Sequence, residues 1–289
     1  MKRIVCLLLA ASLLGLMGCA PQAPAQIAAT TAPVYEFTSL LCRGTDITVT
    51  RLVTESVSCL HDYSLQVSQL RALEAADMIV ISGVGLEDFL AGAIPEDAGI
   101  VDASRDVPLL CPEEEHHHGH EHSHEEDPHI WLSPANAKRM AHNICTALVE
   151  KYPEFTDIFQ TNLASLDQRF DQVEQYAETQ LASLSCRELV TFHDGFGYLA
   201  QAFDLQILHA IEEESGSEAS AAELKHLITL VKEHQLPAVF TEVNGSPAAA
   251  TVISAETGAR LYALDMAMGQ DSWFDAMYYN IDILKEALE

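Results

Sequence analysis

Short runs of β-branched and apolar residues alternate with longer amphipathic stretches along the chain. In the first half this pattern predicts strands at 27–31, 47–53, 78–82 and 100–103, and helices near 34–42, 65–75 and 86–90. In the second half it predicts strands at 188–192, 205–209, 238–241 and 260–263, and helices near 197–203, 221–233, 247–256 and 272–288. Parallel strands are usually joined by helical crossovers, so we expect two α/β domains with parallel-type sheets.

The segment between the two halves has a helical pattern of its own. Ser133-Pro134 combines a good N-cap with a proline in the first turn, and Pro153 restarts a helix in a similar way. From 153 to about 184, apolar residues recur every three to four positions, which predicts one amphipathic connecting helix roughly 45 Å long. The expected division is a first lobe over 33–150, this helix within 151–185 and a second lobe over 186–289.

The N-terminus has the pattern of an export signal. Two basic residues precede the apolar run Ile4–Met17, which is too short for a stable membrane span and is followed at once by Gly-Cys. Residues 16–19, Leu-Met-Gly-Cys, resemble the lipobox of bacterial lipoproteins, in which the cysteine is acylated after cleavage. We therefore expect a signal peptide over 1–18, a lipid anchor on Cys19 and a flexible tether over 19–32.

Charge and composition exclude some classes of protein. The formal net charge is -28 and the hydrophobic content is 48%, values typical of an acidic globular chain with a substantial core. Such acidity makes a nucleic-acid partner implausible, although it raises the local concentration of cations. The sequence contains no C-x-x-C motif, so it indicates neither a cysteine zinc knuckle nor a thioredoxin-type redox site.

An acidic, histidine-rich segment at 113–127 reads Glu-Glu-Glu-His-His-His-Gly-His-Glu-His-Ser-His-Glu-Glu-Asp. It has no apolar residues to pack, so we expect a solvated loop. Imidazoles suit zinc, copper and nickel, which predicts weak multi-site metal capture. The candidate ligands are His116, His117, His118, His120, His122 and His124. The H-E-x-x-H pattern at 120–124 is not interpreted as a peptidase site, because Gly119 and the charge density oppose the helix that this motif needs.

Three other histidines, His61, His129 and His193, are each predicted at a junction between elements, beside an aspartate or a proline-fixed turn. Such junctions are where α/β folds place ligands, so together these residues predict a three-histidine metal site. The remaining histidines are expected in structural roles, in helices (His142, His226 and His234) or at a strand end (His209).

Three segments carry a family resemblance: 61–65 (His-Asp-Tyr-Ser-Leu), 127–134 (Asp-Pro-His-Ile-Trp-Leu-Ser-Pro) and 192–198 (Phe-His-Asp-Gly-Phe-Gly-Tyr). In this order they closely resemble the ligand segments of the zinc-binding solute receptors of bacterial zinc/manganese ABC importers, the metal-binding cluster A-I family. The resemblance covers about 26–289. It implies two α/β lobes joined by one long rigid helix, and a monomeric, extracytoplasmic, lipid-anchored receptor that delivers Zn²⁺ to a membrane permease and its ATPase.

The same resemblance implies a ligand set in the cleft between the lobes. His61 and His129 would come from the first lobe and His193 from the second. Asp265 matches the position of a carboxylate ligand, although the residues after it depart from the family's commoner continuation. Glu242 ends a predicted strand at the same cleft and is a candidate for supporting the ligands.

Five cysteines remain once Cys6 is removed with the signal and Cys19 is acylated, and an odd number cannot all pair. Outside the cytoplasm a disulfide is chemically permitted. Cys59 with Cys111 is the preferred pair, because each lies a short loop away from a proposed ligand. Spacing alone does not establish this pairing.

Other functions remain as alternatives. A manganese receptor of the same family would favour a carboxylate in place of a histidine, because harder oxygen ligands suit Mn²⁺, and His193 argues against it. An exported zinc hydrolase would need an open coordination position and a general base, whereas a closed His-His-His-Asp set leaves no site for an activated water. A surface adhesin is a further alternative, but no adhesive repeat is visible. We therefore expect binding rather than catalysis.

Overall fold

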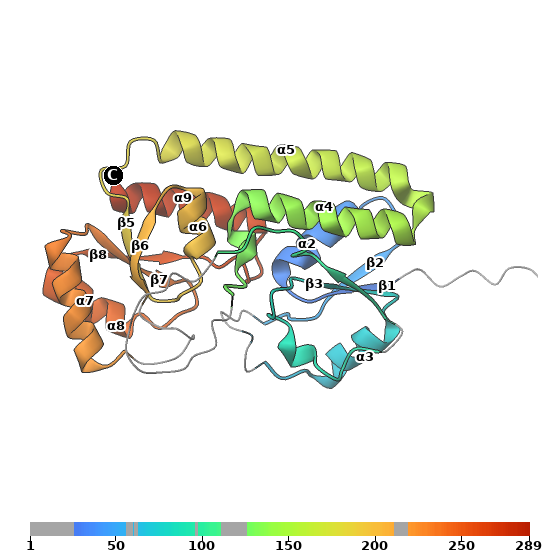
Figure 1. Ribbon diagram of the computed structural model, residues 1–289, viewed down its shortest axis with the longest axis horizontal. Helices are drawn as coiled ribbons and strands as arrows, with labels where there is room; N and C mark the ends of the chain where they lie inside the picture. The colour runs from blue at the N-terminus through green and yellow to red at the C-terminus, as the bar shows by residue number, and fades with distance from the viewer. Residues whose placement is uncertain (1–25, 56–59, 61–62, 96–97, 111–125, 211–218) are drawn as a thin grey trace, which may run out of the picture.

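The computed structural model describes residues 26–55, 60, 63–95, 98–110, 126–210 and 219–289, which form two α/β lobes (Figure 1). The first lobe contains a parallel sheet in the order β2-β1-β3-β4. Its strands are β1 (Gln26–Ala29), β2 (Thr48–Arg51), β3 (Met78–Ile81) and β4 (Gly99–Asp102). The predicted fold class and these four predicted strands are confirmed.

Both faces of this first sheet are covered, as expected for parallel strands. Ile27 and Ala29 of β1 pack into the main core with α2 (Ala32–Leu41), whereas Ala28 between them packs with Leu73 of α3 (Val67–Ala75). Successive side chains of a strand point to opposite faces, so one buried run supplies two cores.

The second lobe repeats this architecture, with all-parallel strands in the order β6-β5-β7-β8. Its strands are β5 (Glu188–Thr191), β6 (Gln206–Ala210), β7 (Ala238–Glu242) and β8 (Arg260–Leu264). Its helices are α6 (Gly197–Ala202), α7 (Ala221–Glu233), α8 (Ala248–Thr257) and α9 (Trp273–Leu288). Helices α7 and α8 share a small core with β5 and β7, while α6 and α9 pack into the main core.

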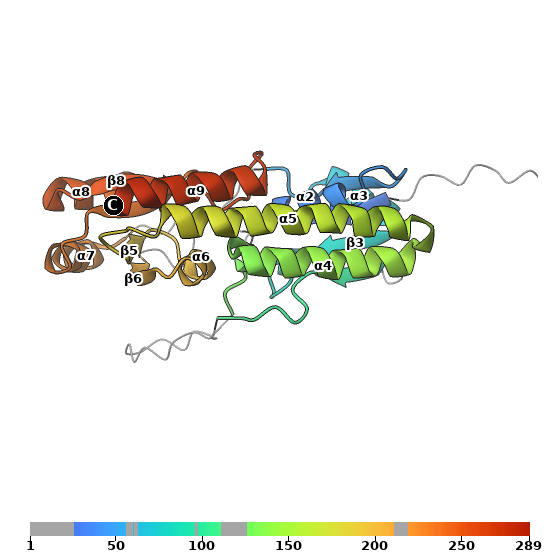
Figure 2. The same ribbon diagram turned by 90° about the horizontal axis from the view of Figure 1, so that it is seen from above.

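Long helices connect the two lobes. Helix α4 (Pro134–Lys151) begins at the N-cap Ser133, whose hydroxyl accepts from the N–H of Asn136, and a short 3₁₀ helix, η3 (Pro153–Phe155), separates it from α5 (Thr156–Gln180). Figure 2 shows α5 between α4 and α9, running along both lobes. At 1.5 Å per residue its 25 residues span about 37 Å, so it is a stiff connector.

Two predicted helices differ in detail from the structure. The connecting helix ends at Gln180 and not near 184, because the chain then turns so that the N–H groups of Ser185 and Cys186 donate to the carbonyl of Leu288 at the end of α9. The helix predicted near 86–90 is a 3₁₀ turn, η1 (Asp88–Leu90). It follows a tight loop in which Gly83, Val84 and Gly85 all have positive φ.

That loop folds around the carboxylate of Glu87, which is only 8% exposed. The carboxylate accepts from the hydroxyl of Thr30 at 2.7 Å and from the N–H groups of Ser82 and Gly83 at 2.7 and 3.0 Å. Burial raises the pKa of Glu87, and these hydrogen bonds oppose the rise. Glu87 therefore ties together the carboxyl ends of β1 and β3, on the rim of the first lobe.

Among the described residues, no helix is long and apolar enough to cross a membrane.

Candidate metal centre

Three side chains of types that can bind a metal ion lie at the carboxyl ends of neighbouring strands in the second lobe. His193 lies two residues after β5, Glu242 ends β7 and Asp265 directly follows β8. Because β5, β7 and β8 are adjacent and parallel, their carboxyl ends share one edge of the sheet. Open parallel sheets bind ligands at this edge.

His129 comes from the chain between the first sheet and α4, and it is the N-cap of a 3₁₀ turn, η2 (Ile130–Leu132). The side chain of Asp127 holds it twice. Asp127 Oδ1 accepts from the backbone N–H of His129 at 2.9 Å and lies 2.7 Å from its Nδ1. A carboxylate at Nδ1 favours the tautomer protonated there, which leaves the lone pair of Nε2 available to a metal ion.

His193 has a similar environment on the other side. It is 4% exposed, and its Nδ1 lies 3.4 Å from Oε1 of Glu242, which is also buried. A carboxylate group beside Nδ1 favours the tautomer protonated there, which leaves Nε2 as the nitrogen that can bind a metal ion. Glu242 thus lies on the Nδ1 side of His193.

The two imidazoles face each other through their Nε2 atoms, which are 3.4 Å apart, and their ring planes are inclined at 86°. Two nitrogens bound to one tetrahedral zinc ion at 2.0–2.1 Å would be about 3.3–3.4 Å apart. A carboxylate near each Nδ1 favours the tautomers in which both Nε2 atoms can bind a metal ion. The arrangement therefore suits a shared cation.

Asp265 is tied to the backbone around it. Its Oδ1 accepts from the N–H of Ala267 at 2.8 Å, and the side chain of Asn280 pairs with its N–H and carbonyl at 2.7 and 2.8 Å. Burial raises the pKa of its carboxyl group. In the described part of the chain, no three His, Cys, Asp or Glu side chains are grouped to hold a metal ion, so Asp265 does not form such a group with His129 and His193.

Several predicted site residues lie outside the described residues: His61, the six histidines His116, His117, His118, His120, His122 and His124, the acylation site Cys19, and the pair Cys59 and Cys111. Cys42, Cys145 and Cys186 lie within them and are free thiols. Burial raises the pKa of Cys42 to about 12 and also raises that of Cys145. These two thiols are therefore poor metal ligands.

The other described histidines interact away from this centre. His142 Nε2 lies 2.9 Å from Oδ1 of Asp167, where α4 meets α5, and His234 Nδ1 lies 2.9 Å from Glu188. The rings of His209 and His226 are 5.7 Å apart.

The structure also reveals supporting residues to which sequence reasoning assigned no role. The hydroxyl of Tyr198 accepts from the N–H of Leu110 at 3.0 Å and donates to the carbonyl of Asp127 at 3.1 Å, so it holds the chain on both sides of 111–125. A Cβ at Gly195 would lie 2.7 Å from His193 Nε2. Both residues belong to the segment 192–198. Its high content of small and aromatic residues was the feature of the sequence that could have indicated their supporting roles.

Two parallel-sheet lobes linked by a long helix, with one histidine from each side meeting between them, place the chain in the class of two-lobed metal receptors. The particular family follows from comparison. The family model for zinc-uptake complex component A, periplasmic (ZnuA), matches residues 27–287, and the chain belongs to this family.

Named relatives agree with this assignment. The high-affinity zinc uptake system protein ZnuA of Bacillus subtilis (strain 168) is 29% identical over 273 residues, which cover 89% of this chain and 85% of that protein. The zinc-binding lipoprotein AdcA of Streptococcus pneumoniae (strain ATCC BAA-255 / R6) is 28% identical over all of this chain, which spans 62% of AdcA. The manganese-binding lipoprotein MntA of Halalkalibacterium halodurans is 25% identical over 79% of this chain and 77% of MntA.

A solved structure shows the same fold. A crystal structure of ZnuA superimposes with a TM-score of 0.80 at 29% identity, covering 91% of this chain and 99% of that one. The predicted two-lobed architecture and family are therefore confirmed.

Proposed function

We propose that this chain is an extracytoplasmic receptor that captures Zn²⁺ between its lobes and delivers it to an ABC importer. The observation that carries the proposal is the 3.4 Å separation of the His129 and His193 Nε2 atoms, each on a ring with a carboxylate at Nδ1. His61 and Asp265 complete the proposed ligand set. Support for His61 comes from its motif. Support for Asp265 comes from its place at the carboxyl end of β8, on the sheet edge where Glu242 ends β7 and His193 follows β5.

Binding and delivery, rather than turnover, is the proposed role. Four protein ligands would fill the tetrahedral shell of zinc and leave no position for a reactive water. The family's place in ABC importers supports a permease and an ATPase as partners of this chain. Relatives named as lipoproteins support acylation of Cys19, which would anchor a monomeric receptor to the membrane. We retain the division at 33–150, 151–185 and 186–289 and the pairing of Cys59 with Cys111 as proposals.

Metal choice and pH test the proposed function together. Three imidazoles must be deprotonated to bind, so zinc affinity is expected to fall steeply below pH of about 6.5, the ordinary pKa of histidine. A site made mainly of carboxylates would keep its affinity to about pH 4. The measurement is competitive binding of Zn²⁺ and Mn²⁺ to the protein lacking 1–18, with elemental analysis after dialysis.

Zinc is expected to outcompete manganese by a wide margin, because the divalent affinity order and the imidazole-rich ligands act in the same direction. Equal or better binding of Mn²⁺ at neutral pH, with little loss at pH 5.5, would contradict the zinc assignment. It would favour instead the manganese function named for MntA.

The histidine-rich segment is proposed to add weaker capture sites and not to form the tight site. Deleting Glu113–Glu126 is expected to leave one tight zinc site and to remove additional weak ones, because a solvated loop loses chain entropy on binding and a preformed cleft loses little. Binding stoichiometry from a zinc titration measures this. Loss of the tight site in the deletion variant would mean that the segment supplies primary ligands.

A further inference from the structure

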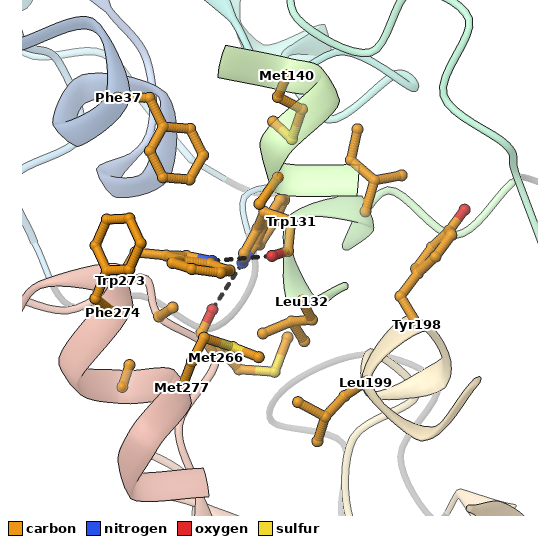
Figure 3. Close-up of a cluster of buried hydrophobic side chains, with 14 of the residues drawn as sticks. Phe37, Trp131, Leu132, Met140, Tyr198, Leu199, Met266, Trp273, Phe274 and Met277 are labelled. Carbon is orange, nitrogen blue, oxygen red and sulfur yellow. Dashed lines mark hydrogen bonds between the residues drawn. The ribbon is translucent and has the colours of Figure 1, made fainter. Parts of the chain in front are cut away.

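The loop that carries Asp265, residues 265–272 between β8 and α9, belongs to the second lobe but is bound by side chains of the first. Nε1 of Trp131 donates to the carbonyl of Met266 at 2.8 Å, as Figure 3 shows. Nη2 and Nη1 of Arg51 donate to the carbonyls of Met268 and Gly269, at 2.8 and 2.7 Å. The loop is therefore shaped by the contact between lobes.

Arg51 is suited to this contact by its chemistry. It is the last residue of β2, an edge strand of the first sheet, and its Nε donates to the carbonyl of Val53. Its guanidinium therefore spans carbonyl groups from both lobes in one planar fork. Burial lowers its pKa, but a guanidinium remains charged at any physiological pH. A lysine ammonium could not reproduce three donors fixed in one plane.

The loop needs such support because its own conformation is unfavourable. Ala267 has φ of 57°, a left-handed conformation that disfavours a residue with a Cβ. In the same turn, the N–H of Ala267 donates to Asp265 Oδ1 and so orients the carboxylate. The carbonyls of Met266 and Met268, on either side of Ala267, are the ones held by Trp131 and Arg51.

Met266 of this loop also lies near the imidazole of His193. The terminal methyl of Met266 and Nε2 of His193 both lie within 3 Å of the point where a Cβ on Gly195 would lie, at 2.8 and 2.7 Å. A displacement of the loop would therefore change the packing around a proposed ligand as well as the position of Asp265.

We propose that Arg51 is a positioning residue of the metal site: its fork to Met268 and Gly269 holds the Asp265 loop against the first lobe and slows release of the bound metal. This inference rests on the proposed function for its effect on metal. For the lobes to separate and release the ion, the two hydrogen bonds to this loop must break. Arg51 thus links the rate of metal release to the separation of the lobes.

The test compares Arg51→Lys with Arg187→Lys. Arg187 is a matched control because it too donates to three carbonyls, those of Leu181, Phe203 and Asp204, away from the metal centre. Both variants keep the charge. Zinc dissociation is measured by stopped flow with a chelator in excess. Arg51→Lys is expected to release zinc about tenfold faster or more, in the range found for groups that support metal ligands, with an unchanged association rate. Arg187→Lys is expected to release zinc at the rate of the unaltered protein.

Equal release rates for Arg51→Lys and the unaltered protein, or equal acceleration in both variants, would overturn the proposal. Amide hydrogen exchange over 265–272 in the metal-free protein supplies a readout that does not depend on zinc. Arg51→Lys should accelerate this exchange about tenfold, whereas unchanged exchange would overturn the positioning role. If the unaltered protein binds no zinc, the proposed function fails, and the exchange measurement still decides the role of Arg51.

Discussion

Replacing His193 by alanine is expected to lower zinc affinity by about 100-fold or more. Structural zinc sites with four ligands bind with about 10–16 kcal/mol, so an even share is roughly 2.5–4 kcal/mol per ligand. The facing imidazole of His129, 3.4 Å away at Nε2, would then lack its partner across the metal. Competition with a chelator of known zinc affinity measures the loss, and His61→Ala and His129→Ala are expected to behave alike.

His142→Ala is the matched control, because His142 is exposed on α4 and its Nε2 contacts Asp167. It should bind zinc as tightly as the unaltered protein. Tight binding that survives in any one of the three ligand variants would show that the residue concerned is not a ligand. His193→Glu should narrow the preference for zinc over manganese, because a carboxylate is the harder donor.

Gly195→Ala is expected to weaken zinc binding by about 10- to 100-fold, the range found when the groups that orient metal ligands are disturbed. A Cβ at this position would lie 2.5 Å from Cδ2 and 2.7 Å from Nε2 of His193, closer than packed atoms approach. The imidazole has little room to move, because it is buried between His129 and Glu242. The methyl group should therefore turn the donor nitrogen away from the metal.

Gly99→Ala provides the comparison, because a Cβ there would meet only the carbonyl of Asp77 at an ordinary 3.7 Å. Zinc affinity by competitive titration and the midpoint of thermal unfolding would be measured for both variants. Gly99→Ala should leave the affinity unchanged. Wild-type affinity in Gly195→Ala would show that the ring of His193 can shift at no cost, and that its observed position is not the one required for binding.

The two histidines of the proposed site and Asp265 are held in different ways. His129 and His193 have defined neighbours, carboxylates behind both rings and facing Nε2 atoms. Asp265 is held by Asn280 of α9 and by Ala267 of the loop whose carbonyls Arg51 binds. The proposed role of Asp265 as a ligand therefore includes a dependence on the contact between lobes, which the Arg51→Lys comparison measures.

The sequence by itself determined the elements and the chemistry of the donors. Alternating short apolar runs and amphipathic stretches predicted the eight strands, because hydrophobic periodicity is a local property of the chain. The start of α4 was also predictable from the sequence, since Ser133 and Pro134 stabilise only the first turn of the helix. The motifs around His129 and His193 identified donor types suited to zinc. The preference of a donor for a metal depends on side-chain chemistry and not on the fold.

Only the tertiary structure decided how those donors are arranged. The 3.4 Å approach of two Nε2 atoms joins residues 64 positions apart, and the bonds from Arg51 to the Asp265 loop join residues more than 200 positions apart. No local pattern encodes such separations, because they depend on how two lobes pack across a long helix. The end of α5 at Gln180 has the same origin: the pattern of apolar residues favours a longer helix, but the bonds from Ser185 and Cys186 to Leu288 require the chain to turn first.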